Sequence, residues 1–155
     1  MKKIKLLNWS LIFFISLGLV GLVSNFGQFL FDKETFKLVY STTRFGINSF
    51  YIINALTCLL LFGLYQVQQS FSSFIKNSFF NSRSALYLKK GGFLLIINGI
   101  LSGVNNLYPS NKSVESLITN YMMYAMIVLI GIGLMAVSDI VSKGEIIEQE
   151  NLLTI

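Results

Sequence analysis

Residues 9–31, WSLIFFISLGLVGLVSNFGQFLF, form a run without a charged side chain. As an α-helix rising about 1.5 Å per residue, this run would extend about 35 Å, enough to cross the hydrocarbon core of a bilayer. The preceding residues 1–5, MKKIK, resemble the basic start of a secretory signal peptide, but no Ala-x-Ala cleavage site follows the run. We therefore expect residues 9–31 to be an uncleaved first membrane span, with a cleaved signal peptide as the alternative.

The composition of the whole chain is that of a membrane protein. Of its 155 residues, 54% are hydrophobic and 12% are charged, and the charged residues cluster between long uncharged runs. A soluble domain is rarely so apolar. The formal net charge is +5, but Lys and Arg flank the apolar runs and do not line a polar face, so we expect no direct binding of nucleic acid.

Cysteine and histidine usage excludes several chemistries. Cys58 is the single cysteine, and the chain has no histidine. An internal disulfide needs two cysteines, while structural zinc sites and Ser-His-Asp triads are built from residue types that are scarce or missing here. We find no catalytic constellation and predict a protein that is not an enzyme, with no catalytic residues, no cofactor and no metal site.

Further apolar runs predict three more spans, at about residues 47–67, 91–108 and 117–138. Asn81 or Ser82 is suited to cap the helix leading into the third span, and Pro109 follows the end of that span. The remaining residues, 139–155, form an acidic, amphipathic tail. We therefore predict one membrane domain over residues 1–155, an all-α, integral membrane four-helix bundle with a cytoplasmic C-terminal tail.

Basic residues are distributed unequally between the two sides of the predicted spans. If the four spans alternate in direction, eight of the 12 Lys and Arg residues fall on the side of both termini and four on the other side. Lys and Arg are enriched in cytoplasmic loops. We therefore expect a multi-pass protein of the bacterial cytoplasmic (inner) membrane, in contact with the lipid bilayer, with both termini in the cytoplasm.

Two amides and two glycines in the predicted spans are candidates for helix packing or for a pocket: Asn54, Asn98, Gly99 and Gly103. An amide in hydrocarbon needs a hydrogen-bond partner, which either a neighbouring helix or a ligand can provide. Gly99 and Gly103 have the small-x-x-x-small spacing that lets two helix backbones approach closely. Packing within one chain and formation of a homodimer both remain open.

The predicted cytoplasmic side carries a basic and an acidic segment. The candidates for interaction there are Arg83, Lys89 and Lys90 near the third span, and Glu145, Glu148 and Glu150 in the tail. We expect the tail to dock as a helix on the basic segment, with Ile147 adding apolar contact. The alternative is that both segments are solvated and the basic one meets anionic lipid, because exposed ion pairs contribute about 0 to 1 kcal/mol.

Two segments of the chain resemble a known family. Residues 79–92, FFNSRSALYLKKGG, place a Phe and a helix-capping residue before a basic helix ending at Gly. Residues 139–155, DIVSKGEIIEQENLLTI, combine an acid and a Gly with a final Leu-Thr-Ile. Both are similar to the bacterial domain-of-unknown-function family 2975, small four-span membrane proteins of unassigned activity. The resemblance implies a gene neighbourhood shared with a small helix-turn-helix regulator.

Two functions are compatible with these features. The leading hypothesis is a membrane partner that sequesters or signals to a cytoplasmic helix-turn-helix regulator through the inner loop and the tail. The alternative is a protein that handles a small molecule or lipid in a cavity between helices, which a wide polar cavity reaching Asn54 and Asn98 would favour. No ionisable residue lies deep within a predicted span, which argues against an ion-coupled carrier.

Overall fold

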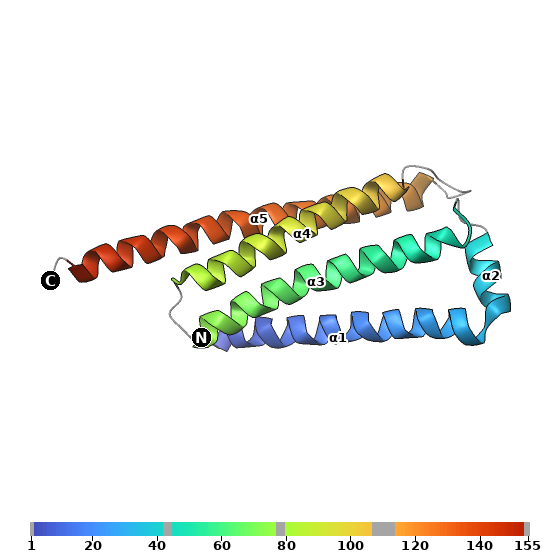
Figure 1. Cartoon of the computed structure of the whole chain (residues 1–155). Coiled ribbons are helices and arrows are strands. Elements are labelled where there is room, and N and C mark those ends of the chain that lie inside the picture. The colour runs from blue at the N-terminus through green and yellow to red at the C-terminus, as the bar shows by residue number, and fades with distance from the viewer. Residues whose placement is uncertain (1, 42–44, 77–79, 107–113, 154–155) are drawn as a thin grey trace.

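The computed structural model describes residues 2–41, 45–76, 80–106 and 114–153, which are helical almost throughout. In chain order the helices are α1 (Lys2–Phe31), α2 (Lys33–Ser41), α3 (Asn48–Lys76), α4 (Ser82–Asn106) and α5 (Val114–Leu153) (Figure 1). Four of them, α1, α3, α4 and α5, are long and apolar enough to cross a membrane. The all-α class and the presence of four helices able to span a membrane are therefore confirmed.

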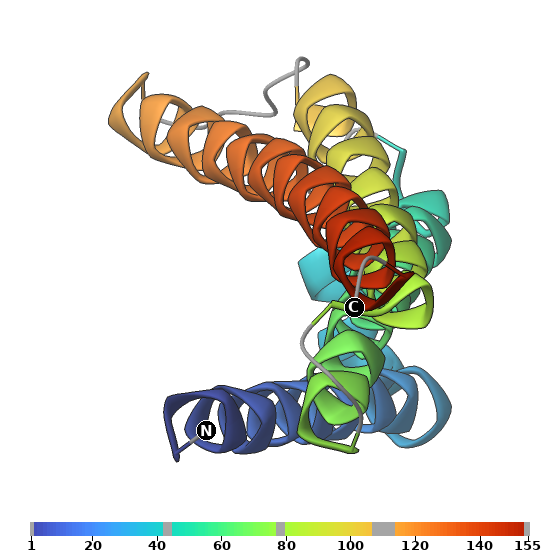
Figure 2. The same ribbon diagram turned by 90° about the vertical axis from the view of Figure 1, so that its left-hand side faces the viewer.

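The four long helices form a row in chain order. α1 packs on α3, α3 on α4 and α4 on α5, and the last of these interfaces is the most extensive. Viewed along the helices, the row follows an open curve with α1 and α5 at the two edges (Figure 2). Because α1 and α5 share no extensive interface in the part of the chain that the structure describes, the arrangement is more open than the expected bundle.

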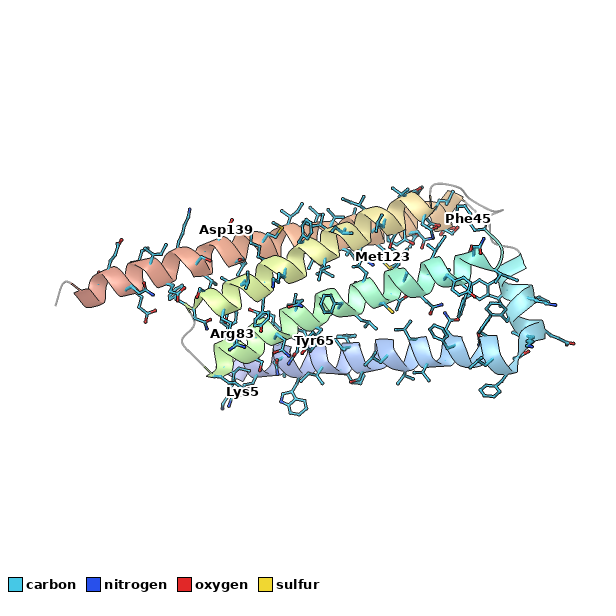
Figure 3. All side chains as sticks on the ribbon, in the orientation of Figure 1. Lys5, Phe45, Tyr65, Arg83, Met123 and Asp139 are labelled. Atoms are coloured by element: carbon cyan, nitrogen blue, oxygen red, sulfur yellow. The ribbon has the colours of Figure 1, made fainter. Side chains whose placement is uncertain are left out.

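Successive long helices run in opposite directions, so the two ends of the molecule differ. The starts of α1 and α4 and the end of α3 lie at one end, near Lys5 and Arg83, while α2 and Phe45 lie at the other (Figure 3). We call these the basic end and the aromatic end. Arg44, Lys112 and the predicted helix stop at Tyr108-Pro109 lie outside the described residues.

The aromatic end is held together by rings around Phe50, which is fully buried. Its ring centroid lies 5.1 to 5.6 Å from those of its neighbours, which are Phe26, Phe29, Phe36, Tyr40 and Tyr51. Such edge-to-face and offset pairs add about 0.5 to 1.5 kcal/mol each beyond the area they bury. The cluster fixes the end of α1 and the start of α3 relative to α2.

α2 is a short helix that the sequence analysis did not predict. Its buried side chains, Phe36 and Tyr40, are four residues apart and therefore lie on one face. Asp32 caps the helix, since its carboxylate accepts a hydrogen bond from the Thr35 N–H at 3.1 Å. The hydrogen bonds from Thr35 lower the pKa of the Asp32 carboxyl group.

α5 continues without a break through the predicted tail. The helix has 40 residues and is about 60 Å long, which is about twice the thickness of the hydrocarbon core. Its last turns project past the start of α4 at the basic end (Figure 1). The residues expected to form a separate tail are therefore the end of the longest helix.

Candidate functional site

α4 packs tightly against both of its neighbours through two adjacent glycines. A β-carbon at Gly91 would lie 3.1 Å from the carbonyl oxygen of Gly63 in α3, and one at Gly92 would lie 2.6 Å from that of Gly131 in α5. Adjacent residues on a helix point about 100° apart. The two neighbours therefore approach α4 from different directions, which bends the row at α4.

The two glycines selected from the sequence differ in their surroundings. A β-carbon at Gly99 would lie 2.9 Å from the carbonyl oxygen of Tyr124 in α5, whereas nothing lies within 4 Å of one at Gly103. The structure thus uses the Gly99 half of the small-x-x-x-small pattern for packing within one chain. The approach of Gly92 to Gly131 was missed, because it joins two helices whose register the sequence does not reveal.

Asn54 belongs to a chain of hydrogen bonds that links three helices. The Asn25 Nδ2 of α1 donates to the Asn54 Oδ1 at 3.3 Å, and the Tyr40 hydroxyl of α2 donates to the Asn25 Oδ1 at 3.1 Å. The Asn54 Nδ2 donates to the carbonyl oxygen of Phe50 at 2.7 Å. Both the oxygen and the nitrogen of the Asn54 side chain therefore have hydrogen-bond partners within the chain.

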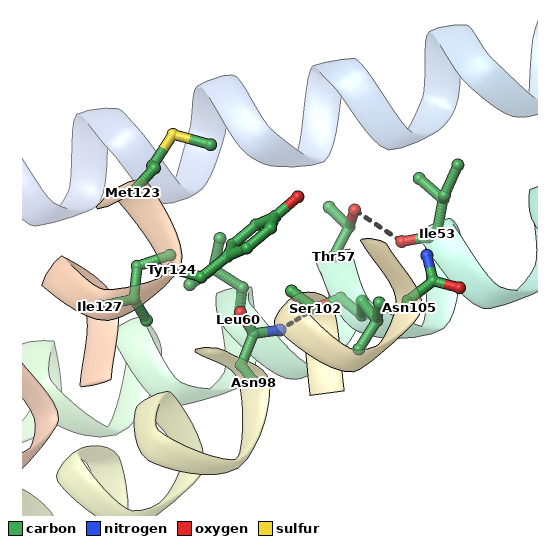
Figure 4. A pocket seen from close by; sticks show the side chains of 10 residues that line it. Ile53, Thr57, Leu60, Asn98, Ser102, Asn105, Met123, Tyr124 and Ile127 are labelled. Atoms are coloured by element: carbon green, nitrogen blue, oxygen red, sulfur yellow. Dashed lines mark hydrogen bonds between the residues drawn. The ribbon is translucent and has the colours of Figure 1, made fainter. Parts of the chain in front are cut away.

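Asn98 lies beside a cavity between α3, α4 and α5 (Figure 4). Its Nδ2 donates a hydrogen bond to the carbonyl oxygen of Leu56 at 2.6 Å. The cavity has a volume of about 210 Å³ and is lined by Ile53, Leu56, Thr57, Leu60, Asn98, Ser102, Asn105, Met123, Tyr124 and Ile127. It reaches Asn98 but not Asn54, and its lining mixes polar and apolar groups.

At the basic end, α5 docks on the start of α4 through buried contacts. The Ser138 hydroxyl donates a hydrogen bond to the carbonyl oxygen of Ala85 at 2.7 Å. One turn further, Val141 is buried in an apolar cluster that includes Leu88. Gly144 lies directly against the ring of Phe80. The start of the predicted tail is therefore held by the packing of Val141 and Gly144, next to the hydrogen bond from Ser138.

Beyond Gly144 the helix α5 has no more of α4 to pack on, because α4 begins at Ser82. Ile147 is 58% exposed, so it does not supply the apolar contact that we expected. Since Ser138 lies level with Ala85 and α5 runs opposite to α4, Glu145 lies two turns further toward the start of α4, away from Lys89. Among the described residues, no ion pair joins Glu145 or Glu148 to Arg83, Lys89 or Lys90.

The corner between α3 and α4 is built by polar contacts. Asn81 caps α4 as predicted, since its Oδ1 accepts a hydrogen bond from the Ser84 N–H at 2.9 Å. The Ser70 hydroxyl of α3 donates to the carbonyl oxygen of Ser84, also at 2.9 Å. Lys89 and Lys90 are exposed on α4, and Glu150 is exposed in the last turns of α5. The contacts of Asn81 and Ser70 therefore join the end of α3 to the start of α4.

Comparisons of this chain with protein-family models, with curated proteins and with solved structures find no match. The fold itself defines the class, which is an all-helical protein with four helices able to cross a membrane. The resemblance to family 2975 stays a prediction from the two segments that carry it.

Proposed function

We propose that the chain is a multi-pass protein of the bacterial cytoplasmic membrane that docks a cytoplasmic protein partner at its basic end. The excess of Lys and Arg at this end supports a cytoplasmic orientation. The observation that carries the proposal is the end of α5, which leaves α4 behind after Gly144 and continues as an exposed helix. The partner class that the family resemblance implies is a small helix-turn-helix regulator.

The last turns of α5, on both sides of Gly144, have a surface suited to protein recognition. Ile140 and Ile147 lie two turns apart on one face, and they are 64% and 58% exposed. Apolar side chains at this spacing are the anchors by which an amphipathic helix enters a groove on its partner. Glu148 and Lys143 flank this face and are also exposed. Charged groups around an apolar centre favour specificity and fast association.

A photo-cross-linking residue at Ile147, introduced in living cells, tests this proposal. We expect a covalent product with a protein that carries a helix-turn-helix domain, and we expect Ile140→Asp to reduce its yield about tenfold by placing a charge in the docked face. The matched control is Ile132, which is exposed on the membrane part of the same helix. If Ile147 gives no protein product beyond that of Ile132, the docking function is wrong.

The second candidate function, handling of a small molecule or lipid, rests on the cavity beside Asn98, which meets only part of the expectation because it does not reach Asn54. Its volume of about 210 Å³ is smaller than the roughly 300 to 1,000 Å³ of most ligand pockets, so it would hold only a small ligand or part of an acyl chain. The same experiment separates the two functions when the probe is placed at Ser102 in the cavity lining. A small-molecule adduct at Ser102, without a protein adduct at Ile147, would favour this candidate.

A further inference from the structure

A second cavity lies at the basic end, in the corner between α3 and α4. It has a volume of about 120 Å³ and is lined by Gln69, Ser72, Ser73, Lys76, Arg83 and Tyr87. Every one of these side chains carries a polar group, in contrast to the mixed lining of the cavity beside Asn98. We call it the basic recess.

The basic recess has a positive electrostatic character. Lys76 is the last residue of α3, and Arg83 lies in the first turn of α4, so the two cations come from different helices. The partial positive charge of a helix N-terminus adds to them. None of the six lining residues is acidic. The Arg83 guanidinium lies 6.0 Å from the centre of the Tyr87 ring, a cation–π contact that helps to orient it.

The recess is preformed by the polar corner that carries it. The Asn81 Nδ2 donates a hydrogen bond to the Ser73 hydroxyl at 3.5 Å, while the Asn81 Oδ1 caps α4. The hydrogen bond from Ser70 to the carbonyl oxygen of Ser84 joins the same two helices. A site whose backbone is already fixed loses little conformational entropy when a ligand binds.

We propose that the basic recess binds the phosphate group of an anionic phospholipid. Two cations with hydroxyl and amide donors beside them match the charge and the acceptor oxygens of a phosphodiester. A lipid is favoured over free phosphate because the surface of α3 next to the recess is apolar. Phe62 and Tyr65 are exposed and stand seven and four residues before Gln69, on the same face of α3. An acyl chain can therefore lie along this surface, from the recess toward the middle of α3. This inference goes beyond the docking of a protein partner.

Native mass spectrometry of the purified full chain, equilibrated with equimolar phosphatidylglycerol and phosphatidylcholine, tests the assignment. We expect retained phosphatidylglycerol, and we expect the double variant Lys76→Gln and Arg83→Gln to retain it roughly tenfold less, since both charged donors are lost. The matched control is Lys2→Gln with Lys3→Gln, which removes two exposed charges at the same end outside the recess.

Two results would overturn this assignment. An equal loss of phosphatidylglycerol in the control variant would show that only net charge matters. Displacement of the lipid by millimolar inorganic phosphate would assign the recess to soluble phosphate. Because the measurement contains no protein partner, its outcome is independent of the docking function.

Discussion

One added side chain has opposite consequences at Gly99 and at Gly103. At Gly99 it meets the carbonyl oxygen of Tyr124 and the Val128 side chain, whereas at Gly103 it meets open space. We expect Gly99→Leu to lower the free energy of unfolding by about 2 kcal/mol, because overpacking forces α4 and α5 apart. Gly103→Leu should change it by less than about 0.5 kcal/mol. Chemical denaturation in detergent micelles measures the free energy of unfolding of both variants. An equal loss of stability in the two would contradict this packing.

Some of these residue contacts could be predicted and others could not. Asn54 and Asn98 were identifiable because an amide in an apolar run requires a partner, and the structure gives both a partner on α1 or α3. The identity of each partner depends on how two helices are staggered. The approach of Gly92 to Gly131 could not be predicted for the same reason: the two glycines are 39 positions apart, and no motif indicates how their helices are staggered.

The contact between α5 and α4 at the basic end is made by small and apolar groups. In a Cys58→Ser background, cysteines at Ala85 and Ser138 should therefore form a disulfide in native membranes, because the Ser138 side chain reaches the backbone of Ala85 and so brings the two residues close together. The yield should be insensitive to salt, since no charge pair holds this contact. Gel mobility under non-reducing conditions measures it.

Cysteines at Arg83 and Glu148 are the comparison for this cross-link. Glu148 lies beyond Gly144, where α5 has left α4, so we expect a low yield from that pair. An efficient, salt-sensitive cross-link between Arg83 and Glu148 would restore the charge-driven docking of the tail and contradict the packing described above.

At the scale of elements, sequence patterns located the four long helices more reliably than their ends. The sequence predicted a fourth span ending near Ser138 and a tail after it, whereas α5 runs unbroken through both, because charged residues do not interrupt a helix in water. The signal for α2 was present in Phe36 and Tyr40, four residues apart behind a capping Asp32. The charged residues Lys33, Glu34 and Lys37 made the segment resemble a loop.

For the molecule as a whole, the basic and aromatic ends predict the orientation in the bilayer. A reporter fused after Ile155 should be active in the cytoplasm, and one inserted between Tyr108 and Leu117 should be active outside, because the excess of Lys and Arg keeps the basic end inside. Alkaline phosphatase and green fluorescent protein fusions at both positions measure this. The reverse pattern would place the projecting end of α5 outside the cell and exclude a cytoplasmic partner.

The unbroken helix α5 also has a mechanical consequence. Tyr124, Gly131, Ser138 and Gly144 are successive points at which α5 lies against α4 or the residues just before it. Beyond the last of these points, the arm from Gly144 to Leu153 is about 14 Å long at about 1.5 Å per residue. The opposite part of the helix borders the cavity at Tyr124 and Met123. Because the helix is continuous from the cavity to the arm, a partner that pulls on the arm would load the contacts between α5 and α4 along that whole length.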